Sequence, residues 1–248
     1  GVQTCALPIS PKVEKPLVAV CAANHGITAQ GVSAFPAEVT KQMVANYAAG
    51  GAAINQICMA NDLGLKVFEL ALDFPTPDVS VVDAFDEQGC AATMAFGMES
   101  LAGGVDLLCF GEMGIGNTAV ASAIYHALWG GEAADWVGPG TGVAGPALAN
   151  KIAVVARAVK RLGGESDPFQ ILRRVGGREI AAMVGALIGA RHQKVPVVID
   201  GFVTTAAAAI VWSMNPAAID HCIFAHCSAE PAHRRVLEKM GKTALLDL

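Results

Sequence analysis

Short apolar runs alternate along the chain with longer stretches in which apolar residues recur every three or four positions. The apolar runs predict buried strands over residues 17–21, 65–72, 105–110, 195–199 and 221–225. The longer stretches predict helices, one from Pro36 to the glycines at 50 and 51 and others over 52–62, 86–101, 117–129, 147–162, 178–190, 204–214 and 231–240. This alternation predicts an α/β fold, with a parallel sheet flanked by helices in a Rossmann-like three-layer arrangement.

Two segments break the alternation. Residues 130–145 are rich in glycine and read as a loop around Trp136, and residues 163–167 form the most linker-like stretch. In open parallel sheets, ligands bind beyond the carboxyl ends of the strands. Residues 111–118, 200–201 and 225–230 follow predicted strands, so we expect them to converge on one crevice.

Residues 111–118 read Gly-Glu-Met-Gly-Ile-Gly-Asn-Thr and lie between a predicted strand and a predicted helix. Backbone N–H groups in such a turn cradle phosphate. The spacing G-x-x-G-x-G differs from both the dinucleotide fingerprint and the Walker loop. A turn whose glycines only permit close packing remains the alternative. Glu112, a carboxylate beside a phosphate cradle, requires a partner or a role.

The composition narrows the possible classes of protein. Hydrophobic residues make up 53% of the 248 and charged residues 16%, with 27 glycines, which suits one domain with a buried sheet. The net charge of −5 argues against nucleic acid or an anionic membrane as the main partner. An anionic substrate must then be held by helix N-termini and a few cations.

No signal peptide and no apolar stretch of membrane-spanning length is present in the sequence. The seven cysteines include no C-x-x-C pair, and the six histidines form no zinc-ligand spacing, so we expect no metal site. These features predict a reduced, cytoplasmic setting.

Taken whole, the octet resembles the signature of the nicotinate-nucleotide:dimethylbenzimidazole phosphoribosyltransferase family. Other segments resemble the same family and together extend the similarity from about Leu17 to the last residue; they are 24–26, 32–44, 50–55, 140–142, 200–202, 228–231 and 245–248. The resemblance implies transfer of phosphoribose from nicotinate mononucleotide to dimethylbenzimidazole, which yields alpha-ribazole phosphate and nicotinate during cobalamin synthesis. It implies no cofactor, and a homodimer for the full-length protein.

For the phosphate, the resemblance implies a set of residues on two facing loops: Gly114, Ile115, Gly116, Asn117 and Thr118 on one, and Gly140, Thr141 and Gly142 on the other. Ala119 stands where the family usually has a second threonine.

Glu112 and Lys151 match family positions whose side chains meet near the nucleotide, so the resemblance implies an ion pair with a supporting catalytic role. Lysine at the start of an apolar helix is otherwise a solvated residue. Arg157, Lys160 and Arg161 are expected to form a solvated face further along that helix.

For the flat base, the resemblance implies Ser33, Gln42 and Met113, with a polar helix position and a loop residue as the plain alternatives for Gln42 and Ser33. For the ribose it implies Asp200, Gly201 and Ser228. Asp200 can instead cap the helix that begins near Thr204. His25 is expected to line the crevice, and Glu230 to favour only the dipole of the following helix.

The two ends of the chain differ from the family pattern. Residues 1–10, including Cys5, resemble a translated adapter, so we expect residues 11–248 to form the single phosphoribosyltransferase domain. The family's additional N-terminal helical segment and its C-terminal part are not matched, which implies a fragment with an incomplete small helical subdomain. The family's general base lies beyond the segment that resembles 245–248, so we expect weak catalysis from this chain.

Two other functions remain open at this stage. A non-catalytic nucleotide-binding module on the same α/β scaffold would show the same glycine turn without turnover. A dehydrogenase-like dinucleotide domain is a weaker option, because the glycine order is wrong for it.

Overall fold

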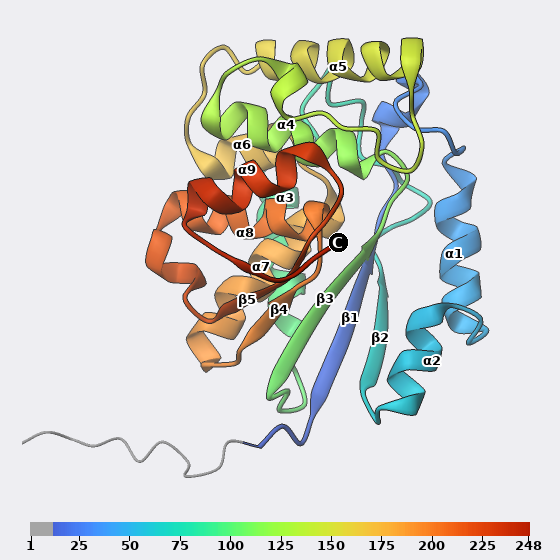
Figure 1. The fold of residues 1–248 in the computed structure, drawn as a ribbon, viewed down its shortest axis with the longest axis vertical. Coiled ribbons are helices and arrows are strands. Elements are labelled where there is room, and N and C mark those ends of the chain that lie inside the picture. The colour runs from blue at the N-terminus through green and yellow to red at the C-terminus, as the bar shows by residue number, and fades with distance from the viewer. Residues whose placement is uncertain (1–11) are drawn as a thin grey trace, which may run out of the picture.

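A computed structural model describes residues 12–248, which contain a six-stranded, wholly parallel sheet of order β2-β1-β3-β4-β5-β6 (Figure 1). The strands are β1 (Pro16–Ala22), β2 (Gly64–Glu69), β3 (Leu107–Met113), β4 (Val197–Ile199), β5 (Cys222–Cys227) and β6 (Ala244–Asp247). The predicted α/β fold is confirmed. The adapter-like leader expected at residues 1–10, with Cys5, lies outside the described residues and stays a prediction.

Helices cover the two faces of the sheet unequally. The short α1 (Glu38–Ala48) and α2 (Ala53–Ala60) pack over Val18 and Val20 of β1. The other face carries the main core, built with α3 (Glu87–Glu99), α4 (Asn117–Trp129), α7 (Arg178–Gln193), α8 (Phe202–Met214) and α9 (Pro231–Met240). Assignment of α1 and α2 to a separate helical subdomain stays a prediction.

Helices α3 and α7 approach to backbone contact, which fixes the layer behind the sheet. A Cβ atom at Gly97 would lie 1.8 Å from the carbonyl oxygen of Ala182, and one at Gly185 would lie 1.8 Å from that of Met94. Only hydrogen side chains fit there. None of the helices within residues 12–248 is long and apolar enough to cross a membrane.

The structure corrects several predicted boundaries. β3 continues through Met113, so Gly111, Glu112 and Met113 belong to the strand and the turn is confined to residues 114–116. The predicted linker is followed by an unpredicted helix, α6 (Pro168–Val175), which Asp167 caps through the Phe169 and Gln170 amides. The edge strand β6 was also missed, and its leucines are exposed. α5 (Gly145–Lys160) lies outside α4.

The order of the strands reverses between β1 and β3, which creates the switch point where open α/β sheets bind ligands. The loops that leave these two strands are joined, because the Ala23 amide donates to the Met113 carbonyl over 3.0 Å. A short 3₁₀ helix, η1 (Gly26–Gln30), continues the first loop. The glycine turn and the His25 loop are therefore neighbours at this point.

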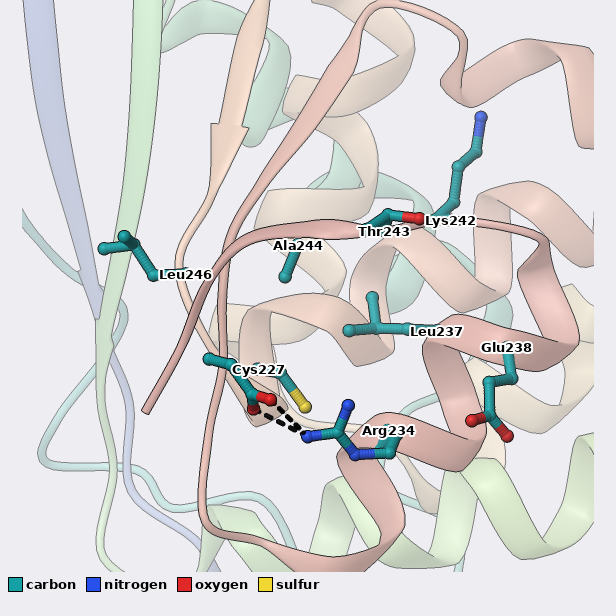
Figure 2. A pocket seen from close by; sticks show the side chains of 9 residues that line it. Cys227, Arg234, Leu237, Glu238, Lys242, Thr243, Ala244 and Leu246 are labelled. Carbon is teal, nitrogen blue, oxygen red and sulfur yellow. Dashed lines mark hydrogen bonds and ion pairs between the residues drawn. The ribbon is translucent and has the colours of Figure 1, made fainter.

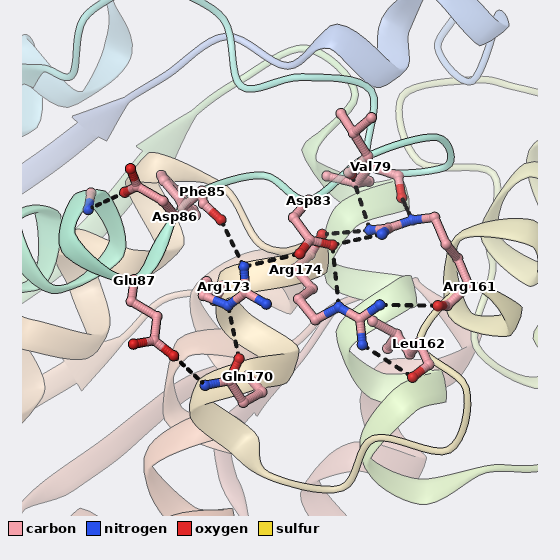
Figure 3. A network of polar contacts seen from close by, with 12 residues as sticks. Val79, Asp83, Phe85, Asp86, Glu87, Arg161, Leu162, Gln170, Arg173 and Arg174 are labelled. Atoms are coloured by element: carbon pink, nitrogen blue, oxygen red, sulfur yellow. Dashed lines mark hydrogen bonds and ion pairs between the residues drawn. The ribbon is translucent and has the colours of Figure 1, made fainter.

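Three arginines converge on one aspartate beside this scaffold (Figure 3). Asp83 accepts from Arg161 at 2.6 Å and Arg174 at 3.2 Å and pairs with Arg173 at 2.9 Å. Arg161 also donates to the Val79, Val82 and Arg174 carbonyls. Arg161 was expected on a solvated face; it instead joins α5 and α6 to the loop that precedes α3.

We expect Asp83→Asn to lower the free energy of unfolding by about 1–3 kcal/mol at pH 7, because three guanidinium groups lose their counter-ion. Burial opposes ionisation of Asp83, but the hydrogen bonds from Arg161 and Arg174 outweigh it and lower its pKa below the ordinary 3.8. This stabilisation is therefore present above pH 3.8 and lost as the pH falls through the lower folded-state pKa. Urea unfolding at pH 7 and pH 3 measures it, with the exposed Glu99→Gln as control. Equal curves at pH 7 would contradict the prediction.

Candidate functional site

A pocket of about 290 Å³ lies between the sheet and the layer formed by α1 and α2. Its floor is apolar and comes from β1, β3, β4 and β5, and Tyr47 of α1 and Ile54 of α2 lie opposite. Glu112 and Asp200, at the carboxyl ends of β3 and β4, supply its two acidic groups. The expectation that these two residues share a crevice is met by this pocket.

Glu112 is the next-to-last residue of β3 and is partly buried in the pocket wall. The amide of Asn117 donates a hydrogen bond to its Oε2 atom. Burial raises the pKa of Glu112 from 4.5 to about 7, the charges of Glu179 and Asp200 add to the rise, and Asn117 and His25 oppose it. A carboxyl group in this state exchanges protons near neutral pH.

The predicted ion pair between Glu112 and Lys151 is wrong. Within residues 12–248 the ammonium of Lys151 instead donates to the Thr118 hydroxyl at 3.0 Å and to the Gly138 carbonyl at 2.9 Å. Lys151 is fully buried in α5, and its pKa is lowered by burial, which the charge of Glu230 partly offsets. The lysine lies on the far side of the glycine turn, so it does not hold Glu112 as a weak base.

Glu230 belongs to the same cluster as Lys151, a contact that its sequence position did not indicate. The Gly140 amide donates to its Oε1 atom at 2.6 Å, and its buried Oε2 atom has no hydrogen-bond partner among the described residues. The cluster thus combines an ammonium, a hydroxyl and a backbone amide, which are donors suited to phosphate. A carboxylate already occupies the amide. Thr141 and Gly142, also expected here, are exposed.

The glycine turn itself offers fewer free amides than its sequence suggests. The Ile115 amide donates to the Thr40 hydroxyl at 3.1 Å, and the Asn117 amide donates to the Gly114 carbonyl at 3.1 Å. These two amides are therefore not available to phosphate. Thr40 is fully buried in α1 and was not singled out, although it lies inside the segment 32–44 that resembles the family.

The three residues expected at the base slot do not line the pocket. The Ser33 hydroxyl accepts from the Phe35 amide at 3.2 Å within its own loop, and Gln42 is exposed on α1. Met113 packs with Ala22 in a small separate cluster. The apolar floor of the pocket, which no motif indicated, is the larger flat surface beside Glu112.

The ribose candidates lie at the ends of β4 and β5. Asp200 is exposed and lies 3.6 Å from His226, but it does not cap α8. Instead, the Gly201 amide donates to the Thr204 hydroxyl, which donates back to the Gly201 carbonyl. The alternative reading of Asp200 as a helix cap is therefore wrong.

Ser228 is held by a buried histidine. Its amide donates to His233 Nδ1 at 3.0 Å, which makes that nitrogen an acceptor, and its hydroxyl lies at the same distance. The other ring nitrogen, Nε2, then carries the proton and donates to Thr205 at 3.1 Å. Burial lowers the pKa of His233 to about 4, so this ring is neutral at pH 7.

His25 does not line the crevice as expected. It is 2% exposed, and its Nε2 atom lies 2.8 Å from Oε1 of Glu179, a residue that the sequence analysis did not single out. Glu179 is in the first turn of α7 and is fully buried. A buried acid following two glycines was the only signal in the sequence.

Two further observations concern other kinds of site. Within residues 12–248, no group of three or more histidine, cysteine, aspartate or glutamate side chains is arranged to hold a metal ion. A second pocket, of about 270 Å³, lies between α9 and β6, where Arg234 forms a bidentate pair with Asp247 (Figure 2). It contains none of the site residues predicted from the sequence.

The fold and the pocket define an open parallel α/β protein whose ligand crevice lies at its switch point. Residues 2–248 match the family model DBI_PRT, described as phosphoribosyltransferase, and the chain belongs to that family. It is 62% identical over 240 residues to nicotinate-nucleotide–dimethylbenzimidazole phosphoribosyltransferase of Brucella anthropi, and 63% identical over 239 residues to that of Rhizobium meliloti. Each alignment covers 96% of this chain and 71% of the relative.

Solved structures agree with this assignment. The crystal structure of CobT from Thermus thermophilus superposes with a TM-score of 0.89 at 38% identity, over 96% of this chain and 77% of that one. A second structure from the same organism, named for the same phosphoribosyltransferase, gives a TM-score of 0.88 at 36% identity, over 96% and 76% of the two chains.

The raised pKa of Glu112 predicts how stability changes with pH. The folded chain holds this proton up to about pH 7 and the unfolded chain only to 4.5, so stability falls as the pH rises between these values. Because Glu112 borders an open pocket, we expect a loss of about 1–2 kcal/mol. Thermal unfolding from pH 4.5 to 8 should show a smaller decline for Glu112→Gln than for the parent, and Glu99→Gln should follow the parent. Parallel curves for Glu112→Gln and the parent would contradict the prediction.

Proposed function

We propose that this chain transfers phosphoribose from nicotinate mononucleotide to 5,6-dimethylbenzimidazole, forming alpha-ribazole phosphate and nicotinate. The names of the relatives supply the substrates. One observation supports the proposal above others. A single short turn, residues 114–116, joins Glu112, in an apolar pocket, to Thr118, in a cluster of phosphate donors.

The cluster around Lys151 is proposed to hold the phosphate. Lys151, Thr118 and the Gly140 amide converge there, and a Cβ atom at Gly140 would lie 3.2 Å from the Lys151 nitrogen and 3.0 Å from the Thr118 oxygen. Thr118 is in the first turn of α4, where the helix dipole also favours an anion. Glu230 competes for the Gly140 amide, so its carboxylate must move aside or accept a phosphate proton when the nucleotide binds.

The apolar pocket is proposed to hold the azole. One ring nitrogen forms the new bond to C1′ of the ribose, the bond from C1′ to nicotinate breaks, and its electron pair stays on the pyridine nitrogen. The N–H of the other ring nitrogen must then lose its proton. Glu112 is the described group best suited to accept it, because its pKa is about 7.

The resemblance places a general base beyond Leu248, and Glu112 is the alternative acceptor within the described chain. Asp200 and Ser228 are proposed to contact the ribose from the ends of β4 and β5. Ser33, Gln42 and Met113 remain proposed contacts to the base, which require movement of the loop before α1. The homodimer and the cytoplasmic location implied by the resemblance also remain predictions.

We expect Lys151→Met to weaken binding of nicotinate mononucleotide about tenfold to a hundredfold, because one charged hydrogen bond is lost while the side-chain volume is kept. Titration calorimetry measures the affinity, and circular dichroism checks the fold. Lys160→Ala, on the exposed face of the same helix, is the matched control and should bind like the parent. Unchanged affinity for Lys151→Met would remove Lys151 from the phosphate site.

We expect Glu112→Gln to slow nicotinate release about 10²–10⁴-fold in the presence of dimethylbenzimidazole, because the azole proton loses its acceptor. Affinity for nicotinate mononucleotide should stay within about threefold, since the phosphate donors are unchanged. Steady-state assays at pH 7.5 test this, with Glu99→Gln as control. Equal rates for parent and Glu112→Gln would place the general base elsewhere, and no release by the parent under any condition would refute the proposed function.

A further inference from the structure

His25 and Glu179 form a buried ion pair directly behind the glycine turn. The two side chains are 1% and 0% exposed, and His25 Nε2 lies 2.8 Å from Glu179 Oε1. The contact is a charge contact, since neither carboxylate oxygen of Glu179 meets hydrogen-bond geometry with any described partner. A carboxylate so enclosed is costly, and its retention calls for a role.

The histidine ring is held in place from its other side by the strand-like segment around Thr76. The Gly26 amide donates to the Thr76 carbonyl at 2.7 Å, and the Thr76 amide donates to the Asn24 carbonyl at 3.0 Å. The Thr76 hydroxyl lies 3.5 Å from His25 Nδ1. Backbone contacts therefore fix the ring, so that Nε2 can only face Glu179 and the glycine turn.

Two glycines leave the space that the pair occupies. A Cβ atom at Gly114 would lie 2.9 Å from His25 Nε2, and one at Gly177 would lie 2.4 Å from His25 Cε1 and 2.8 Å from Glu179 Oε2. Gly114 is the first residue of the turn after β3, and Gly177 is the N-cap of α7. The pair thus contacts the turn directly.

The turn connects the pair to Glu112. The Gly114 carbonyl accepts from the Asn117 amide at 3.1 Å, and the Asn117 side chain donates to Glu112. The charges that act on Glu112 come from β4, α7 and the His25 loop: Asp200 and Glu179 disfavour its anion and His25 favours it. Tyr47 and Cys21 also adjoin Glu112, but burial raises the pKa of both, that of Cys21 to about 12, so both are neutral.

We propose that Glu179 is a positioning residue for Glu112: it holds His25 beneath Gly114 and places a second negative charge behind the carboxyl group that accepts the azole proton. The inference rests on the proposed function and deepens it. Glu179 touches no substrate. Its charge makes Glu112 a better proton acceptor, and its contact with His25 fixes the turn that carries Asn117.

The test is Glu179→Gln, which keeps the shape of the side chain and removes its charge. Carbon-13 NMR of glutamate-labelled protein follows the Glu112 carboxyl directly, and Glu112→Gln assigns its signal. We expect the Glu112 midpoint to move down by about one pH unit. The acid limb of the kcat profile for nicotinate release should move the same way, and kcat at pH 7.5 should fall about threefold to thirtyfold. KM for nicotinate mononucleotide should stay within about twofold.

Two further variants keep the inference falsifiable. Glu99→Gln is the matched control and should leave the Glu112 midpoint in place. If Glu179→Gln does not fold, His25→Gln gives an independent reading with the opposite sign, because removing a group that favours the Glu112 anion should raise the midpoint. An unmoved midpoint in a folded Glu179→Gln, or in His25→Gln, would overturn the proposal. A midpoint that moves in a chain that releases no nicotinate would support the coupling and refute the proposed function.

Discussion

The carboxyl edge of the sheet carries more negative than positive charge, and the properties of the crevice depend on this imbalance. Parallel strands deliver Glu112 and Asp200 to one edge, and Glu179 stands behind them. The nearby cations are few, because Lys151 lies across the turn with Glu230 and His25 is taken up by Glu179. Glu112 therefore has no ion-pair partner among the described residues, and its pKa rises to about 7.

The glycine turn separates two chemical environments that the proposed reaction needs at once. On one side, Thr118 and Lys151 offer donors to an anion, and on the other side Glu112 faces an apolar pocket. A mixture of the two would fail, since an ammonium beside Glu112 would lower its pKa and weaken it as a base. The turn keeps them apart because Thr40 binds its Ile115 amide and His25 fills the space beneath Gly114.

The regular elements were predicted well wherever a local pattern specifies them. Helix α4 runs from Asn117 to Trp129 and α9 from Pro231 to Met240, as the apolar spacing indicated. The missed elements lacked such a pattern. α6 has eight residues and follows a stretch rich in glycine, and β6 exposes two of its leucines, so neither showed a buried face in the sequence.

The sequence by itself determined the α/β class, the family and the loops that carry the site, because strand and helix periodicities and the octet are local properties of the chain. Only the tertiary structure decided which side chains meet. Lys151 binds Thr118 rather than Glu112, and Glu179 reaches His25 from the other half of the chain. Contacts between residues far apart depend on the crossing of α7 behind β1 and on the packing of α5 on α4. No local spacing encodes either geometry, so the charges that set the chemistry of Glu112 became visible only in the folded chain.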